Sequence, residues 1–343
     1  MKAIVKNRKE EGFDYQEVEI PEVRLKDVLI RVKVAGICGS DLNFYEWNSW
    51  CEGIVNRLPF IPGHECSGEV VKVGRQVKLF REKDRVSVET HLPCGKCFQC
   101  RNGQPNICQN MELFGHTFNG CFAEYCSVPE AIVEKIPDEL PWEYAALLEP
   151  IGIPLRGVWE GQVGGDSVAV IGCGPIGQFA IGVSSAMGAS QIFGLDVSEK
   201  RLTIARKMGA THLLNPAKES VIEIIMDLTH QNGVGVIIEA SGDSKALSNS
   251  FKYLRKGGKV FVIGNIKEPL VLDGIADIVN KEVTIRGLHG REFFKTWWLA
   301  ESLLLSGKLK IDPVITHKFP LKEFNKGFQL ATSGKACKVL LFP

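Results

Sequence analysis

One glycine-rich segment limits the possible folds of this chain more than any other. Residues 172–177 read G-C-G-P-I-G, follow the apolar run 168–171 and open a helical pattern that continues to Met187. A G-x-G-x-x-G turn between a strand and a helix lets the backbone approach a pyrophosphate, which then rests at the helix N-terminus. A glycine-rich turn in another α/β fold is the alternative. The candidate dinucleotide-binding residues are Gly172, Gly174, Pro175, Ile176 and Gly177.

An acidic residue after the next predicted strand favours NAD over NADP. Asp196 follows the strand predicted at 191–195, roughly 20 residues beyond the glycines, where a carboxylate is expected to bind a ribose 2′-hydroxyl. The same carboxylate would repel a 2′-phosphate. Arg201, on the following predicted helix, is a secondary candidate for contact with a phosphate or the adenine side.

Strands and helices alternate from residue 167 onward, which predicts a parallel sheet with helices on both faces. We therefore expect residues 151–287 to form a doubly wound, Rossmann-type domain. The predicted strands lie at 168–171, 191–195, 212–214, 236–239, 259–263 and 283–285, and the predicted helices at 175–187, 198–208, 221–228 and 245–254.

The first 150 residues follow a different pattern. Short β-rich runs at 28–34, 68–74 and 84–88 are separated by glycine and proline, which is typical of a small β-barrel. The last run, 338–342, carries strand signals and could pair with this first domain. A length of 343 residues also favours two domains over one.

Charge and hydropathy exclude several partner classes. The formal net charge of +1 gives no support for a nucleic-acid or lipid-headgroup partner. Residues 1–10 are mixed and charged, unlike a secretory signal. The most apolar window, 168–183, is broken by glycines and is shorter than the roughly 20 residues that span a bilayer. We expect a cytoplasmic protein without a membrane partner.

Four cysteines gather in one short segment. Four thiolates at this spacing can close a tetrahedral zinc site, and full ligation predicts a structural role. An iron–sulfur cluster or unrelated thiols are the alternatives. We expect the segment to be a loop without secondary structure, folded by its metal. The four residues are Cys94, Cys97, Cys100 and Cys108.

A second group of possible metal ligands combines Cys38, His64 and Glu65. A thiolate, an imidazole and a carboxylate are ligands that zinc uses in catalytic sites, where one position stays open. Taken alone, a cysteine and a histidine of this kind are also typical of buried structural residues.

The order of these features resembles the zinc-dependent medium-chain dehydrogenases over the whole chain. The features are Cys38, the G-H-E at 63–65, the four-cysteine segment, Glu149 before Pro150, and the glycine loop with Asp196. The resemblance implies a GroES-like β-barrel catalytic domain, residues 1–150 and 288–343, around a Rossmann domain at 151–287.

The resemblance also implies roles for individual residues. Cys38 and His64 would bind a catalytic zinc, with Glu65 and Glu149 as further or exchanging ligands, and the four cysteines would bind a second, structural zinc. Ser40 would be the proton-relay hydroxyl, and His91 would line the substrate pocket. A homo-oligomer is implied, with a tetramer favoured over a dimer.

Within this family, the stretches 45–50, 290–297 and 306–317 are similar to the L-threonine 3-dehydrogenases. They imply oxidation of the small-molecule alcohol L-threonine to 2-amino-3-oxobutanoate, with hydride transfer to NAD. The chain departs from that pattern at Asn43, where a relay histidine is usual, in the run 151–156, and at an unexpected His116. A polyol or sugar-alcohol dehydrogenase, or a non-catalytic protein that keeps the fold, are the alternatives.

Overall fold

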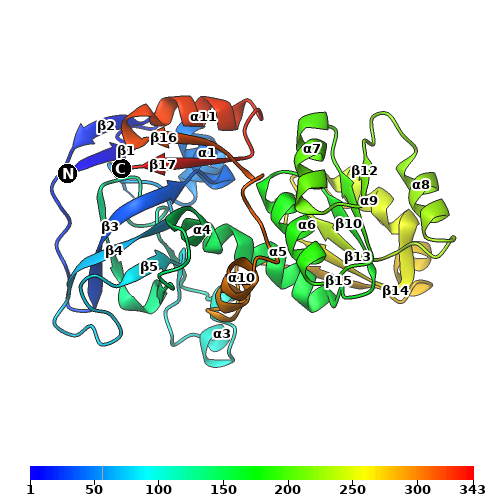
Figure 1. Ribbon diagram of the computed structural model, residues 1–343, viewed down its shortest axis with the longest axis horizontal. Helices are drawn as coiled ribbons and strands as arrows, with labels where there is room; N and C mark the ends of the chain where they lie inside the picture. Colours follow the sequence, from blue (N-terminus) through cyan, green and yellow to red (C-terminus); the bar gives the residue numbers. More distant parts are fainter. Residues whose placement is uncertain (56) are drawn as a thin grey trace. The chain divides into compact units, whose positions relative to one another are not determined.

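The computed structural model describes residues 1–55 and 57–343 and divides into two compact units (Figure 1). The terminal unit contains residues 1–150, 292–297 and 315–343, and the central unit contains 151–291 and 298–314. The division after residue 150 lies where we expected a domain boundary. Residues 288–291 and 298–314, which we expected with the chain ends, fall in the central unit.

The central unit is built on a six-stranded sheet in which every neighbouring pair is parallel. The strand order β12-β11-β10-β13-β14-β15 is that of a doubly wound dinucleotide-binding sheet. The strands are β10 (Ser167–Ile171), β11 (Gln191–Leu195), β12 (His212–Leu214), β13 (Val234–Glu239), β14 (Leu254–Val262) and β15 (Thr284–Gly287).

The position of each strand in this sheet follows from its apolar content. Every residue of β10 and β13 is buried, as continuous apolar runs are in the middle of a parallel sheet. Every residue of the edge strand β15 is exposed. The helices of this unit are α5 (Leu148–Gly161, which begins in the terminal unit), α6 (Pro175–Ala186), α7 (Glu199–Met208), α8 (Val221–Leu228) and α9 (Ser244–Ser250).

One predicted helix ends earlier than expected. We predicted a helix at 245–254, but α9 stops at Ser250, a 3-10 turn covers Phe251–Tyr253, and Leu254 already begins β14. The helix starts sharply because the Asp243 side chain accepts hydrogen bonds from the backbone N–H groups of Lys245 and Ala246.

The terminal unit contains a second sheet, of order β16-β17-β3-β4-β5-β9, with β8 also paired to β3. The prediction that the final run pairs with the first domain is confirmed, because β17 runs antiparallel to β3. The red and blue ends of the chain therefore meet in one unit (Figure 1). The strands are β3 (Asp27–Gly36), β4 (Glu65–Val73), β5 (Arg85–Val88), β8 (Tyr125–Pro129), β9 (Val133–Lys135), β16 (Ile315–Pro320) and β17 (Lys338–Phe342).

Short elements complete the terminal unit. The four-cysteine segment carries a one-turn helix, α3 (Phe98–Arg101), and a 3-10 turn at Pro105–Ile107, so the expectation of a loop without secondary structure was wrong. Pro105 stands at the start of its turn, where its missing N–H costs nothing. The others are β1 (Lys2–Val5), β2 (Asp14–Glu17), β6 (His91–Leu92), β7 (Glu112–Leu113), α1 (Gly39–Glu46), α2 (Ser49–Glu52), α4 (Trp142–Ala146) and α11 (Phe324–Thr332). The helix α10 (Lys295–Leu305) begins in the terminal unit and continues in the central unit.

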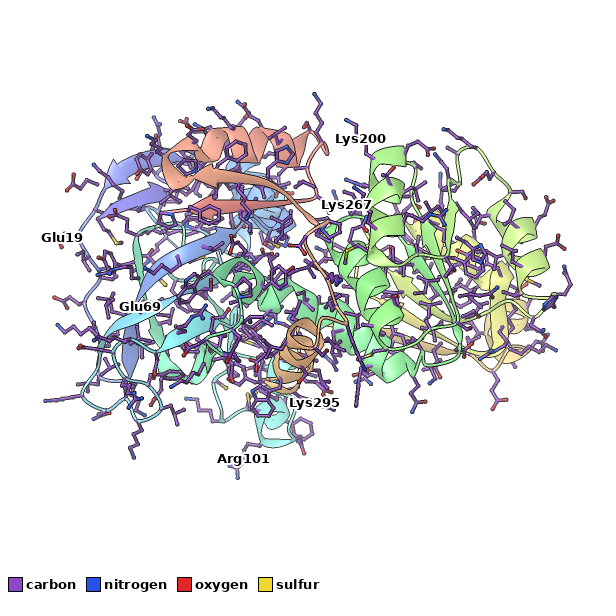
Figure 2. The ribbon with its side chains drawn as sticks, in the orientation of Figure 1. Glu19, Glu69, Arg101, Lys200, Lys267 and Lys295 are labelled. Carbon is purple, nitrogen blue, oxygen red and sulfur yellow. The ribbon has the colours of Figure 1, made fainter. Side chains whose placement is uncertain are left out.

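Charged side chains of both signs project from the ribbon, as Glu69, Arg101 and Lys200 do in Figure 2. This mixture agrees with the formal net charge of +1. None of the helices in the described parts of the chain has the length and apolar character needed to cross a membrane.

Candidate active site

Two adjacent strands bring the mixed ligand group together. Cys38 follows the end of β3, and His64 and Glu65 stand at the start of β4. One ligand atom from each of these residues lies within 4.8 Å of the others. Gly36 is opposite Glu65 in the ladder, and a Cβ on Gly36 would come 2.2 Å from Glu65 Oε2. The close approach of the two strands therefore requires glycine at position 36.

A buried aspartate organises the nitrogen and sulfur ligands. Asp41 Oδ2 accepts a 2.8 Å hydrogen bond from the Cys38 backbone N–H, and Asp41 Oδ1 lies 3.6 Å from His64 Nδ1. Burial alone would lower the pKa of His64, but the charges of Asp41 and Cys38 raise it well above its ordinary value. Sulfur, nitrogen and carboxylate donors in negatively charged, buried surroundings fit a zinc ion.

Glu65 is held by the last strand of the chain. Lys338 Nζ donates to both carboxylate oxygens, at 2.8 and 2.9 Å, and to the Ile37 carbonyl at 3.1 Å. The side chains of Lys338 and Glu65 are 2% and 0% exposed. Burial alone lowers the pKa of Lys338, but the negative charge of Glu65 raises it above its ordinary value, so the lysine is a cation.

Glu149 lies near this group without belonging to it. Glu149 stands in the first turn of α5, where its Oε1 accepts a hydrogen bond from the Thr90 hydroxyl. Its charge contributes, after burial, to the raised pKa of Glu65. Among the described residues, the group whose ligand atoms lie within 4.8 Å of one another consists of Cys38, His64 and Glu65.

The unexpected histidine is part of the site. His116 Nε2 lies 3.2 Å from Ser40 Oγ, and the centre of its ring is 4.6 Å from that of His64. Burial, then the charges of His64 and His91, lower the pKa of His116 well below its ordinary value. Sequence reasoning noted His116 but missed this contact, because no local pattern links residues 76 positions apart.

Asn43, by contrast, serves the turn after α1. Its Oδ1 accepts a 2.6 Å hydrogen bond from Asn48 Nδ2, and its backbone carbonyl accepts from the Asn48 N–H. The side chain is therefore engaged in local structure, and His116 is the histidine beside Ser40.

His91 is buried in β6, beside an acidic neighbour. Its Nδ1 lies 2.9 Å from Glu89 Oε1, and the centre of its ring is 6.2 Å from that of Phe293. Phe293 belongs to the 290–297 stretch that resembles the threonine enzymes.

The four-cysteine lobe (94–108) is a separate ligand group. Its four sulfur atoms all lie within 4.8 Å of one another. The backbone N–H of Lys96 lowers the pKa of Cys94 to about 6, whereas burial raises that of Cys100 to about 12. Four sulfur ligands this close together, one of them an already acidic thiol, fit a structural zinc ion, which prefers four-coordinate sites of this kind.

The glycine loop of the central unit has the geometry required for a nucleotide site. Gly172 has φ +87°, and a Cβ on Gly177 would lie 1.8 Å from the Gly172 carbonyl oxygen. Pro175 is the first residue of α6 and Ile176 the second. Both glycines are therefore needed to join β10 to α6 this tightly.

Asp196 ties the loop to the next strand. Its Oδ2 accepts from the Cys173 N–H and its Oδ1 from the Ser198 N–H, both at 2.8 Å. Arg201 Nη1 lies 3.5 Å from Asp196 Oδ2. The predicted cofactor residues are thus close together within this unit.

The run 151–156, which departs from the threonine-dehydrogenase pattern, contributes an arginine that binds neighbouring backbone. Arg156 Nε donates to Glu160 Oε1 at 2.9 Å, and its Nη1 lies 3.4 and 3.5 Å from the carbonyl oxygens of His289 and Gly290. This departure from the threonine pattern therefore supports the backbone that leads into residues 290–297.

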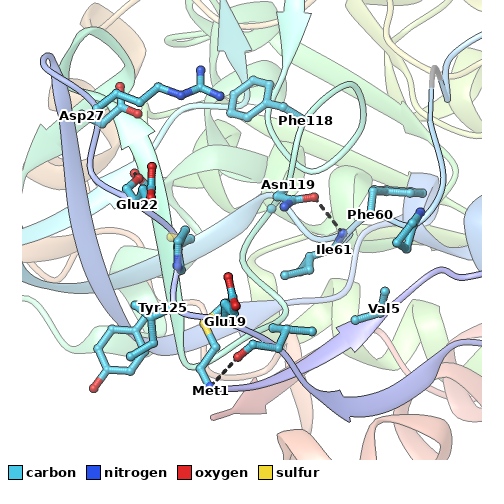
Figure 3. Close-up of a pocket in the computed structure, with 18 of the residues that line it drawn as sticks. Met1, Val5, Glu19, Glu22, Asp27, Phe60, Ile61, Phe118, Asn119 and Tyr125 are labelled. Carbon is cyan, nitrogen blue, oxygen red and sulfur yellow. Dashed lines mark hydrogen bonds between the residues drawn. The ribbon is translucent and has the colours of Figure 1, made fainter.

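A cavity of the terminal unit lies apart from these groups (Figure 3). Glu19, Glu22, Phe118 and Asn119 are among its lining residues, and Asn119 accepts a 3.2 Å hydrogen bond from the Ile61 N–H. The described residues that line it include none of the candidate ligands, so it is not the candidate active site.

The chain matches two family descriptions. Residues 24–138 match the alcohol dehydrogenase GroES-like domain, and residues 175–305 match the zinc-binding dehydrogenase domain. The chain is 41% identical to the L-threonine 3-dehydrogenase of Bacillus licheniformis, covering 100% of this chain and 99% of that protein. The L-threonine 3-dehydrogenase of Pyrococcus furiosus is also 41% identical, with 99% and 98% coverage.

Solved structures agree with these relatives. The 2R,3R-butanediol dehydrogenase of Bacillus subtilis has a TM-score of 0.91 at 31% identity, covering 100% of this chain and 99% of that one. An Escherichia coli CFT073 alcohol dehydrogenase, solved with NADH, has a TM-score of 0.91 at 28% identity, with the same coverage. This chain therefore belongs to the zinc-dependent medium-chain alcohol dehydrogenases, enzymes that combine a GroES-like domain with a Rossmann sheet and use zinc and a nicotinamide cofactor.

Proposed function

We propose that the chain oxidises L-threonine to 2-amino-3-oxobutanoate and transfers the hydride to NAD. The observation that carries the proposal is the Cys38–His64–Glu65 group with the Ser40 hydroxyl, hydrogen-bonded to His116, beside it. The choice of threonine is supported by the relatives that are 41% identical over nearly the whole chain and by their similarity in the 290–297 stretch.

Cys38 and His64 would hold the catalytic zinc, with Glu65 and Glu149 as the candidates for exchange at a further position. A zinc ion supplies Lewis acidity there and lowers the pKa of the substrate hydroxyl. Lys338 restrains Glu65 through both carboxylate oxygens, while Thr90 orients Glu149. The sulfur group at 94–108 would hold a second, structural zinc ion.

The substrate proton would leave through Ser40 and His116. Ser40 Oγ can accept the proton of the alcohol and pass its own to His116 Nε2, 3.2 Å away. The lowered pKa of His116 keeps the ring neutral, so Nε2 can accept a hydrogen bond from Ser40, and it makes the ring a weak base that would hold the proton only in passing. Asn43 cannot act as a base in the proton path, so His116, from a different segment of the chain, would take that role.

Asp196 supports NAD as the cofactor, since its carboxylate would repel a 2′-phosphate.

Self-association is supported by the exposed edge strand β15, because an unpaired strand edge is a template for pairing. It is also supported by the exposed apolar side chains of Val271, Ile275 and Val279. We retain a tetramer over a dimer on family resemblance. A cytoplasmic location is supported by the clustering of four cysteines as a metal-ligand group, because such clusters are more typical of intracellular proteins than disulfide frameworks are.

A polyol dehydrogenase of the same family is the second candidate. It is favoured by the replacement of the relay histidine by Asn43 and by the structural likeness to a butanediol dehydrogenase. The non-catalytic alternative conflicts with the intact ligand groups and glycine loop.

The test is a screen of NAD and NADP reduction with L-threonine, polyols and sugar alcohols, using zinc-loaded enzyme. We expect L-threonine to give the highest kcat/KM, with NAD preferred. A polyol that exceeds L-threonine by tenfold would overturn the threonine assignment and leave the zinc mechanism standing.

A substitution of His116 tests the proton path. His116→Val removes the partner of Ser40, so kcat should fall by about 10² with the Kd for NAD unchanged. His212→Gln, in the central unit, is the matched control and should retain kcat. An unchanged kcat in His116→Val would show that the proton leaves by another route.

A further inference from the structure

Glu89 is a buried carboxylate with hydrogen bonds on both oxygens. Its Oε1 accepts from the backbone N–H of His91 at 3.0 Å and lies 2.9 Å from His91 Nδ1. Its Oε2 accepts from the indole Nε1–H of Trp297 at 3.0 Å. Glu89 and Trp297 are each 1% exposed and His91 is 8% exposed, so these bonds form away from water.

The direction of these bonds assigns the imidazole tautomer. A backbone N–H and an indole N–H can only donate, and each points at a different oxygen of Glu89. An ionised carboxylate with these two donors is an acceptor at both oxygens. A neutral His91 ring therefore carries its single proton on Nδ1 and donates it to the ionised carboxylate at 2.9 Å, which leaves Nε2 as the acceptor nitrogen.

We propose that Glu89 is a positioning residue for substrate recognition, which fixes His91 in the Nδ1–H tautomer while Trp297 fixes Glu89. This inference rests on the proposed function in one respect, that His91 lines the substrate pocket. The backbone places His91 next to the candidate site, because the preceding residue, Thr90, donates a hydrogen bond to the candidate ligand Glu149.

The fixed tautomer defines the chemistry that His91 recognises. A substrate group that meets Nε2 must donate a hydrogen bond, as an ammonium or a hydroxyl group does. A carboxylate cannot donate and would be rejected at this position. The pair therefore selects an alcohol with a neighbouring donor, such as an amino alcohol or a diol, over a simple hydroxy acid.

Trp297 makes the inference testable by rescue. In Glu89→Gln, the amide has one acceptor oxygen, so its NH₂ group must face either the donors of His91 or the indole N–H. Each orientation places two donors against each other. In the double variant Glu89→Gln/Trp297→Phe the indole donor is gone, so the amide oxygen can face His91 and keep the tautomer.

The experiment uses the zinc-loaded, full-length enzyme labelled with ¹⁵N-histidine, with the His91 signal assigned by its loss in His91→Gln. We expect the Nδ1–H tautomer in the unmodified enzyme and in Trp297→Phe, its loss in Glu89→Gln, and its return in the double variant. The kcat/KM for L-threonine should fall by about 10–100-fold in Glu89→Gln, because replacing such a carboxylate by an amide selects the wrong tautomer. It should return to within about threefold of Trp297→Phe in the double variant.

Zinc content and the Kd for NAD are measured for each variant and should not change. An Nε2–H tautomer in the unmodified enzyme, or a double variant as impaired as Glu89→Gln, would overturn the inference. If Glu89→Gln does not fold, the tautomer in the unmodified enzyme and in the double variant still decides. If the unmodified enzyme shows the expected tautomers but does not oxidise L-threonine, the positioning role stands and the proposed substrate fails; the rescue is then measured with the best alcohol of the screen.

Discussion

The two ligand groups of the terminal unit are assembled in opposite ways. The lobe takes all its sulfur atoms from residues 94–108, which are joined by one short helix and one turn. The mixed group joins the end of β3 to the start of β4, and its carboxylate is held by a lysine 273 residues away. One group is encoded locally, whereas the other exists only when the sheet is complete.

The two groups should therefore have different roles, with the lobe contributing to folding and the mixed group to catalysis. A lobe with four sulfur ligands leaves no open position for a substrate, so a metal bound there would stabilise structure only. The mixed group offers three different donor atoms and has polar neighbours, Ser40 and His116, that can move a proton. The comparison predicts that damage to one group changes activity and damage to the other changes stability.

The largest expected effect is on activity. His64→Ala removes one proposed zinc ligand of the mixed group and should lower kcat/KM by at least about 10³, since metal activation of the alcohol is worth several kcal/mol. The lobe should keep its zinc, measured by elemental analysis, and the circular dichroism spectrum should not change. Near-normal turnover in this variant would remove the basis for two distinct roles.

The second effect is on stability. Lys338→Met leaves Glu65 buried without its cation, which should lower the free energy of unfolding by about 3–5 kcal/mol. Lys318→Met, which breaks the partly exposed pair with Glu143, is the matched control and should cost about 0–1 kcal/mol. Urea unfolding of the two variants gives the comparison, and equal losses would mean that burial of the Glu65 pair is unimportant.

The smallest expected effect on catalysis comes from the lobe. Cys100→Ser removes one of the four sulfur ligands, so the lobe should lose its zinc and become sensitive to proteolysis. Turnover per folded molecule should stay within about threefold of the unmodified enzyme, because structural zinc contributes to folding and not to the reaction. A loss comparable to that in His64→Ala would show that the lobe takes part in catalysis.

The central unit was the more predictable part of the fold. Its strands are continuous apolar runs, and the loop 172–177 lies where the spacing of glycines indicated. The limits of α9 were less predictable, because Asp243 fixes its start while its end gives way to β14.

The candidate site was predictable in its ligands but not in their neighbours. The side chains next to the ligands come from distant segments: Lys338 contacts Glu65, Trp297 contacts Glu89, and His116 contacts Ser40 across 273, 208 and 76 residues. No local periodicity encodes such pairs, since they depend on the packing of the whole unit. The sequence showed that His116 and the run 151–156 depart from the threonine-dehydrogenase pattern. The structure shows what they contact: His116 contacts Ser40, and Arg156 contacts the carbonyl groups of residues 289 and 290.

The pairing of β17 with β3 sets an order of events during synthesis. A chain emerging from the ribosome contains all four cysteines of the lobe once residue 108 has been made, so that group can capture its metal early. The mixed group has Cys38, His64 and Glu65 even sooner, but the lysine that neutralises Glu65 is in the last strand. The proposed catalytic group should therefore be among the last parts of the protein to mature, and a truncated chain lacking β17 would be left with a buried carboxylate and no counter-ion.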